Sequence, residues 1–147
     1  MIPRRLSVVT RITDDVPALA AFYERMGWAA APGADEDHAI LVLGGATLFL
    51  WSRRQAEPEI GAPMRAAGHA APDTVLAINV ETRDEVDAAI ETARAGGATV
   101  ITEPVDREWG GRSAHFCDPD GTAWEVAWVP GSRVSDDPAV AWPAPGG

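Results

Sequence analysis

The order of predicted secondary-structure elements occurs twice along this chain, and this internal repeat is the strongest constraint on its fold. Residues 6–13 alternate and are rich in β-branched types, which predicts a strand, and residues 14–27 then carry apolar side chains at helical spacing. Three more strands are predicted after this helix. The same succession starts again at residue 74, roughly 68 residues later. The repeat therefore predicts an α+β fold built from two tandem βαβββ modules.

Local signals set the limits of these elements. In the first module Asp14 or Asp15 can cap the helix, and Gly27 is placed to end it. In the second module Thr82 and Glu85 have the spacing of a capping box. The remaining strands are predicted at residues 28–31, 38–43 and 47–51 of the first module, and at 99–105, 113–117 and 123–129 of the second.

Composition divides the chain into four parts. The first module spans residues 1–52, and the second spans residues 74–130. Residues 53–73 between them are rich in Pro, Gly and Ala, which predicts a linker or lid. Residues 131–147 lack periodicity and are predicted to form a C-terminal extension.

Charge and hydropathy argue against nucleic-acid and membrane partners, and the cysteine content argues against a disulfide-stabilised fold. Acidic residues outnumber basic ones by 22 to 12, for a formal net charge of −10, whereas nucleic-acid phosphates require a basic surface. No apolar stretch approaches the ~18 residues needed to span a membrane. Cys117 is the single cysteine, so no disulfide framework can form within the chain. With no signal peptide evident at the start, we expect a reducing, cytoplasmic location and neither a nucleic-acid nor a membrane partner.

Two motifs carry a resemblance to a known family. The stretch "TDDVPALAAFYERMGW" in the first module and "FCDPDGTAWEVAW" in the second resemble the vicinal oxygen chelate superfamily. This superfamily includes glyoxalase I, bleomycin-resistance proteins, fosfomycin-resistance enzymes and extradiol dioxygenases. The lead-in "W-G-G-x-S" at residues 109–113 and the stretch "W-E-V-A-W" resemble a glyoxalase-like branch. The resemblance implies a partly open, eight-stranded, barrel-like sheet around a central cavity, with helices outside, and a homodimer.

The alternation of side chains along the predicted strands indicates which residues face the cavity. On 123–129, Glu125 lies among small residues, whereas the opposite face carries Trp124 and Trp128. A hairpin centred on the D-P-D-G turn places His115 opposite Glu125 on that face. The same reasoning on the other strands, with Trp109 added at a strand entrance, gives the candidate ligand-binding residues Ser7, Arg11, Phe49, Trp51, Val75, Asn79, Trp109, Ser113, His115 and Glu125.

The resemblance implies a divalent metal ion, but most residues at the corresponding ligand positions cannot bind one. The superfamily's His and Glu ligands correspond here to Ser7, Phe49, Val75 and Glu125, of which only Glu125 is a competent ligand. A catalytic site needs at least three protein ligands. We therefore expect no metal and no other cofactor.

Three roles remain open for Glu125. It can contact a ligand or act as a catalytic base, with His115 as its catalytic partner; it can form a structural pair with His115 or Arg11; or it can bind a metal. The main hypothesis is a metal-free protein, like the bleomycin-resistance relatives, that holds an apolar or aromatic small molecule in its cavity. The alternative is a lyase, isomerase or dioxygenase-type enzyme that uses Glu125 as base or metal ligand.

Overall fold

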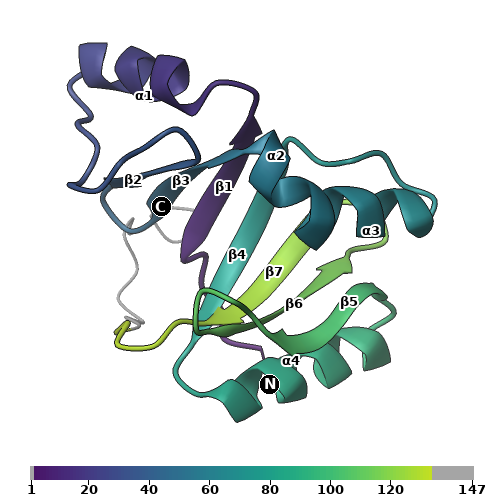
Figure 1. Cartoon of the computed structure of the whole chain (residues 1–147). Helices are drawn as coiled ribbons and strands as arrows, with labels where there is room; N and C mark the ends of the chain where they lie inside the picture. Colours follow the sequence, from purple (N-terminus) through teal and green to yellow (C-terminus); the bar gives the residue numbers. More distant parts are fainter. Residues whose placement is uncertain (1, 134–147) are drawn as a thin grey trace, which may run out of the picture.

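One open, mixed sheet of seven strands forms the centre of the molecule (Figure 1). The structure is a computed structural model and describes residues 2–133, so most of the predicted C-terminal extension lies outside the described residues. The strand order is β2-β3-β1-β4-β7-β6-β5. The strands are β1 (Val8–Thr13), β2 (His38–Val42), β3 (Thr47–Ser52), β4 (Thr74–Val80), β5 (Thr99–Asp106), β6 (Arg112–Cys117) and β7 (Ala123–Trp128).

The two predicted modules meet where β1 pairs with β4 in the antiparallel direction. Each module repeats the same arrangement, because β1 pairs with β3 and β4 pairs with β7 in the parallel direction. The α+β class and the repeat are confirmed, but the sheet has seven strands instead of eight. Residues 28–31 do not form a strand: Trp28 donates its backbone N–H to Tyr23 and stacks on the Tyr23 ring, with 5.7 Å between ring centroids. These contacts tie Trp28 to the end of the preceding helix.

A long helix covers the outer face of each module (Figure 1). Helix α1 (Val16–Arg25) is capped by Asp15, which accepts a hydrogen bond from the N–H of Ala18, and it packs on β2 and β3. Helix α4 (Arg83–Ala95) begins with the predicted capping box of Thr82 and Glu85 and packs on β5, β6 and β7. The apolar residues that α4 buries include Val80, Val86, Ile90, Ala114, Phe116 and Val126.

Residues 53–66, predicted as part of a linker or lid, are helical and cover the opposite, inner face of the sheet. They form α2 (Arg53–Ala56), one π-helical turn η1 (Glu57–Gly61) and α3 (Ala62–Ala66), which we call the helical segment. Ala56, Ile60 and Met64 pack on an apolar cluster of the inner face that contains Ile12, Val75, Cys117 and Ala123. Not all helices therefore lie outside, and this segment brings a further carboxylate, Glu59, to the inner face.

The prolines explain why the sequence did not predict this helical segment. Pro58 and Pro63 lie in the first turns of η1 and α3. A proline in a first turn lacks only a backbone N–H that has no helical partner there, so the helix continues. The spacing of Ala56, Ile60 and Met64, four residues apart, is the helical signal that the Pro, Gly and Ala content obscured.

Candidate functional site

Three side chains with metal-binding or proton-transferring groups converge on the inner face of the second module. Glu59 comes from the helical segment, His115 from β6 and Glu125 from β7. One ligand atom of each side chain lies within 4.8 Å of the other two. We call Glu59, His115 and Glu125 the carboxylate–imidazole cluster. Sequence reasoning placed His115 and Glu125 together but did not identify Glu59.

The β6–β7 hairpin fixes the relative position of His115 and Glu125. They are directly paired in the antiparallel register, as the D-P-D-G turn predicted. In that turn the Asp118 carboxylate accepts the backbone N–H groups of Asp120 and Thr122, which holds the register of the hairpin. The Nε2 atom of His115 lies 2.9 Å from a carboxylate oxygen of Glu125.

His115 is held on both sides of its ring. Its side chain is only 1% exposed, and Nδ1 lies 2.8 Å from the hydroxyl oxygen of Thr102. With the proton on Nε2, the imidazole donates to Glu125 and the Thr102 hydroxyl donates to Nδ1. With the proton on Nδ1, the imidazole donates to Thr102, and Nε2 directs a lone pair toward Glu125. The second arrangement requires a proton or another cation between His115 and Glu125.

Arg107 holds the third member of the cluster. Its Nε atom lies 3.4 Å from a Glu59 carboxylate oxygen and donates a 2.8 Å hydrogen bond to the Ser113 hydroxyl. The Nη2 atom of Arg107 is buried and has no hydrogen-bond partner among the described residues. This orphan N–H group is available to a polar atom of a bound molecule, since buried polar groups are generally satisfied.

Burial raises the pKa of Glu59 above its ordinary value of 4.5, and the neighbouring negative charge of Glu125 adds to the rise. The positive charge of Arg107, the His115 ring and a hydrogen bond from Trp109 oppose it. The Glu59 side chain is 13% exposed and that of Glu125 is 19% exposed. Two poorly solvated carboxylates therefore lie together with one guanidinium.

Trp109 lies at the edge of this cluster because of the two glycines that follow it. Gly110 has a φ of 95°, a left-handed conformation that side chains other than glycine rarely adopt. The Trp109 ring then lies over Gly111, where a Cβ atom would overlap it. The indole remains 48% exposed. Trp109 can therefore contact both Glu59 and a molecule in solution.

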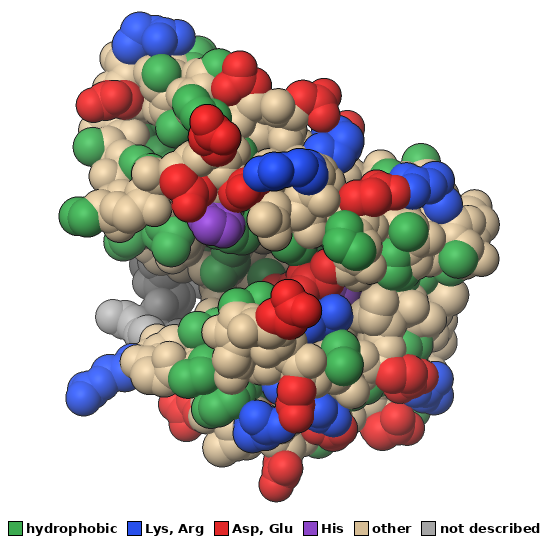
Figure 2. All heavy atoms as spheres, viewed as in Figure 1, with side chains coloured by type: hydrophobic (Ala, Val, Ile, Leu, Met, Phe, Trp, Pro, Cys, Tyr) green, Lys and Arg blue, Asp and Glu red, His purple; other side chains and the backbone are tan. Residues whose placement is uncertain are grey.

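Aromatic side chains form a wall on the inner face of the first module. Phe49 and Trp51 project from β3 with 6.1 Å between their ring centroids, and the His38 ring stacks on Phe49 at 6.3 Å. These rings are half-buried or exposed, and Ile40 beside them is 46% exposed. Figure 2 shows the surface hollowed between the two modules, with hydrophobic side chains along its walls and charged side chains deeper inside.

The other predicted site residues do not all line the hollow. Asn79 and Ser113 share the inner face with Glu125 through the strand pairings, whereas Val75 is buried beneath the helical segment. The Ser7 hydroxyl accepts a hydrogen bond from the backbone N–H of Asn79, so Ser7 joins the first module to the second. None of the positions that correspond to family metal ligands except Glu125 supplies a ligand atom to the carboxylate–imidazole cluster.

The prediction that Arg11 faces the cavity is wrong. Thr10 pairs with Val75 and Phe49, so Val8, Thr10 and Ile12 face inward. Arg11 pairs with Leu50, which packs on the α1 side of the sheet, and its side chain is exposed there. A shift of one residue moves a whole strand to the other face. Of the two predicted structural partners for Glu125, only His115 can reach it.

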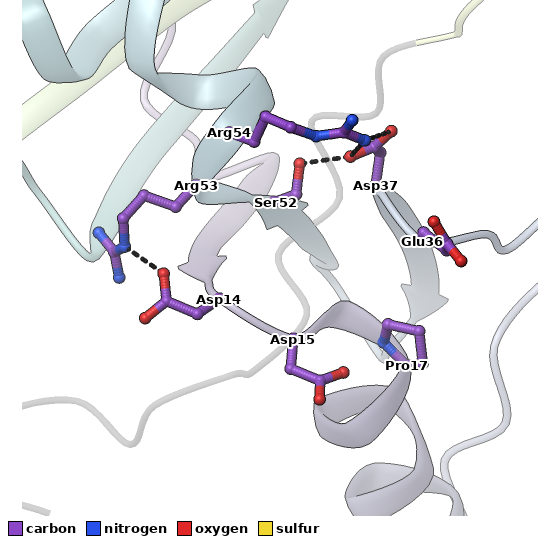
Figure 3. Close-up of a pocket in the computed structure, with 8 residues that line it drawn as sticks. All are labelled: Asp14, Asp15, Pro17, Glu36, Asp37, Ser52, Arg53 and Arg54. Carbon is purple, nitrogen blue, oxygen red and sulfur yellow. Dashed lines mark hydrogen bonds and ion pairs between the residues drawn. The ribbon is translucent and has the colours of Figure 1, made fainter.

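A separate hollow of about 430 Å³ lies at the start of α1, away from the carboxylate–imidazole cluster (Figure 3). Both of its arginines already have partners: Arg53 binds Asp14 at 2.8 Å, and Arg54 binds Asp37 at 2.7 Å. It contains none of the predicted site residues, and its ion pairs join α2 to the residue after β1 and to the residue before β2. Its lining residues are Asp14, Asp15, Pro17, Glu36, Asp37, Ser52, Arg53 and Arg54.

Comparison with known proteins gives one family. The sequence model of the Glyoxalase/Bleomycin resistance protein/Dioxygenase superfamily matches residues 5–126. No curated protein matches the chain. Within the described part of the chain, no helix has the length and apolar character to cross a membrane.

Several solved structures are similar. An NAD-dependent benzaldehyde dehydrogenase from Legionella pneumophila has 18% identity and a TM-score of 0.68 over 83% of this chain and 97% of that chain. A methylmalonyl-CoA epimerase from Streptomyces coelicolor has 18% identity and a TM-score of 0.58 over 89% and 98% of the two chains. A glyoxalase-related enzyme from Fulvimarina pelagi has 26% identity and a TM-score of 0.44 over 96% and 99%. The first two likenesses show a shared fold.

Proposed function

Because the chain belongs to the glyoxalase/bleomycin resistance protein/dioxygenase superfamily, we propose that it binds a small organic molecule with an apolar or aromatic part between its modules. One observation carries the proposal: an aromatic wall and a polar cluster lie on the same inner face of one sheet. Such a combination of apolar walls with a few polar groups is typical of small-molecule sites. The aromatic part of the ligand would contact Phe49 and Trp51, and Trp109 would close over its other end.

The cluster also indicates the polar part of the ligand. Glu59 and Glu125 supply two acceptors for hydrogen bonds, against the one guanidinium of Arg107. A group that donates hydrogen bonds or carries positive charge would therefore be favoured over a carboxylate. Stronger binding of a positively charged ligand than of a carboxylate would therefore distinguish a specific site from nonspecific adsorption to exposed aromatic rings.

Tryptophan fluorescence tests the proposal directly. 2-Naphthylmethylamine and 2-naphthoic acid share one ring system, and we expect the amine to bind and to quench the emission more strongly at equal concentration. Trp51→Ala should weaken binding of the amine by about tenfold, a loss of about 1.4 kcal/mol. Trp28→Ala is the matched control, because Trp28 stacks on Tyr23 at the end of α1. Equal loss of binding in both variants, or no binding to the wild-type protein, would refute the proposal.

A second candidate function is proton transfer within the same superfamily fold. It is favoured by the arrangement of His115, which is buried and held between Thr102 and Glu125. Glu125, paired with a histidine held in this way, can act as a base that removes a proton from the carbon next to a carbonyl group. Incorporation of deuterium from heavy water into a propionyl thioester of N-acetylcysteamine, detected by NMR, measures this step. Glu125→Gln should abolish the exchange, and an exchange rate that the variant leaves unchanged would exclude Glu125 as the base.

A further inference from the structure

The carboxylate–imidazole cluster has the donor set of a metal centre. Glu59 and Glu125 supply carboxylate oxygens, and His115 supplies a ring nitrogen, with the three ligand atoms within 4.8 Å of one another. A first-row divalent ion binds such atoms at about 2.0–2.2 Å, so ligands around one ion lie within roughly 4.4 Å of each other. A movement of a few tenths of an ångström in the long Glu59 side chain closes the difference.

Neighbouring side chains fix the direction of two of these ligands. Hydrogen-bonding groups just beyond the ligands do the same at known metal sites. The Thr102 hydroxyl can accept the proton of His115 Nδ1, which leaves the Nε2 lone pair directed at the cluster. Arg107 lies against one oxygen of Glu59 and is itself held by Ser113. His115 and Glu59 therefore each have a neighbour that fixes their direction before an ion binds.

The balance of charge also favours a cation. Two carboxylates are brought together at a poorly solvated position, and Arg107 is the charged group that opposes them there. Arg107 approaches Glu59 alone, through its Nε atom at 3.4 Å. A divalent ion between the two carboxylates would neutralise the remaining repulsion and would satisfy the Nε2 lone pair of His115.

We propose that Glu59, His115 and Glu125 hold one first-row divalent cation, such as Zn²⁺ or Mn²⁺, with coordination positions left open toward the hollow. Two carboxylate oxygens and one imidazole nitrogen suit these ions. The ligand set differs from the one the family resemblance implies, because Ser7, Phe49 and Val75 take no part. Glu59 of the helical segment and His115 of β6 join Glu125 in their place. The proposal goes beyond the binding of an organic molecule and does not depend on it.

Metal titration of the full chain after chelation tests the site. Isothermal titration with ZnCl₂ and with MnCl₂ should show one ion per chain. Glu59→Gln and Glu125→Gln should each weaken binding at least about tenfold. Glu57→Gln is the matched control, since Glu57 lies in the same helical turn but pairs with Arg65. No binding of either ion, or equal affinity in Glu59→Gln and the wild-type protein, would overturn the proposal.

A spectroscopic measurement identifies the histidine without disturbing the cluster. The chain has three histidines, and the double variant His38→Asn, His69→Asn keeps only His115. The electron spin echo of bound Mn²⁺ should then show coupling to a histidine nitrogen. Its absence at full metal loading would place the ion elsewhere and overturn the assignment, even if a His115→Asn protein fails to fold. A titration with 2-naphthylmethylamine in the presence of a chelator tests the binding of the organic molecule without any metal. The metal site and the organic-ligand site can therefore be refuted separately.

Discussion

The indole ring of Trp109 lies directly over Gly111, with no room between them for a side chain on residue 111. A Cβ atom there would overlap the Trp109 ring and the backbone carbonyl oxygen of Trp128. The Trp128 carbonyl belongs to the sheet and cannot move freely, so the ring and the strand must both adjust. The glycine therefore allows the Trp109 ring to lie against the strand.

Gly111→Ala should lower the free energy of unfolding by about 1–3 kcal/mol, because overpacking forces such adjustments. Urea unfolding monitored by circular dichroism measures the change. Gly44→Ala is the matched control: a Cβ atom at Gly44 meets nothing within 4 Å, so the expected change is within about 0.5 kcal/mol. A Gly111→Ala protein as stable as the control would show that Trp109 does not lie against the strand.

Ile60→Ala should lower the free energy of unfolding by about 2–5 kcal/mol, as expected for a large-to-small change in a core. Ile60 is 0% exposed and packs in the inner apolar cluster through the helical segment. Ile40→Ala removes the same atoms from a side chain that is 46% exposed and should cost much less. Equal losses in a chemical unfolding experiment would mean that the helical segment does not dock on the sheet.

Acid should destabilise the protein through Asp37. Arg54, and then Ser52, lower the pKa of this carboxyl from 3.8 to about 2 by hydrogen bonding to it. The folded state then binds the proton less tightly than the unfolded state, so the stabilisation is complete above the unfolded pKa and is lost as the pH falls from 3.8 toward about 2. Asp37→Asn should flatten the acid side of the stability curve, and Arg54→Met should flatten it in part. An unchanged slope in both variants would contradict the assignment.

Cys117 should resist thiol reagents in the native protein. Its side chain is 0% exposed, its sulfur lies 3.5 Å from the sulfur of Met64, and burial raises the pKa of the thiol. The reactive thiolate is therefore both scarce and shielded. Labelling with iodoacetamide, measured by mass spectrometry, should proceed only as fast as the protein opens and should accelerate in urea. Labelling of native protein at the rate of the unfolded chain would be incompatible with this position.

Much of the fold was predictable because local signals and long-range periodicity agree. The helix caps at Asp15 and Thr82 are where the sequence places them. The pairing of His115 with Glu125 could be predicted from one turn and strict alternation on both strands. In these regions one face of the strand is clearly distinct from the other, which fixes the register.

The prediction for Arg11 failed, and Glu59 was missed, where the local signals and the long-range periodicity conflict. Strand β1 is covered on both faces, by α1 on one side and the helical segment on the other, and it carries apolar residues in both phases, at Val8 and at Val9. Its alternation therefore could not show that Arg11 points away from Glu125. Glu59 was not predicted because its surroundings, "EPEIG", favour a loop by composition, and its position depends on packing by Ile60 against distant strands.

The single π-helical turn has a consequence for how proteins of this shape can diverge. It lies between α2 and α3, and it is this turn that carries Glu59. Each residue added to or removed from a helix rotates the remainder of that helix by about 100°. A deletion of Pro58 would therefore rotate Glu59 relative to α2 and turn its carboxylate away from the hollow, with no change in the sequence of any of the seven strands. The chemistry of the inner face can thus change by a shift of helical phase, without any substitution in the sheet.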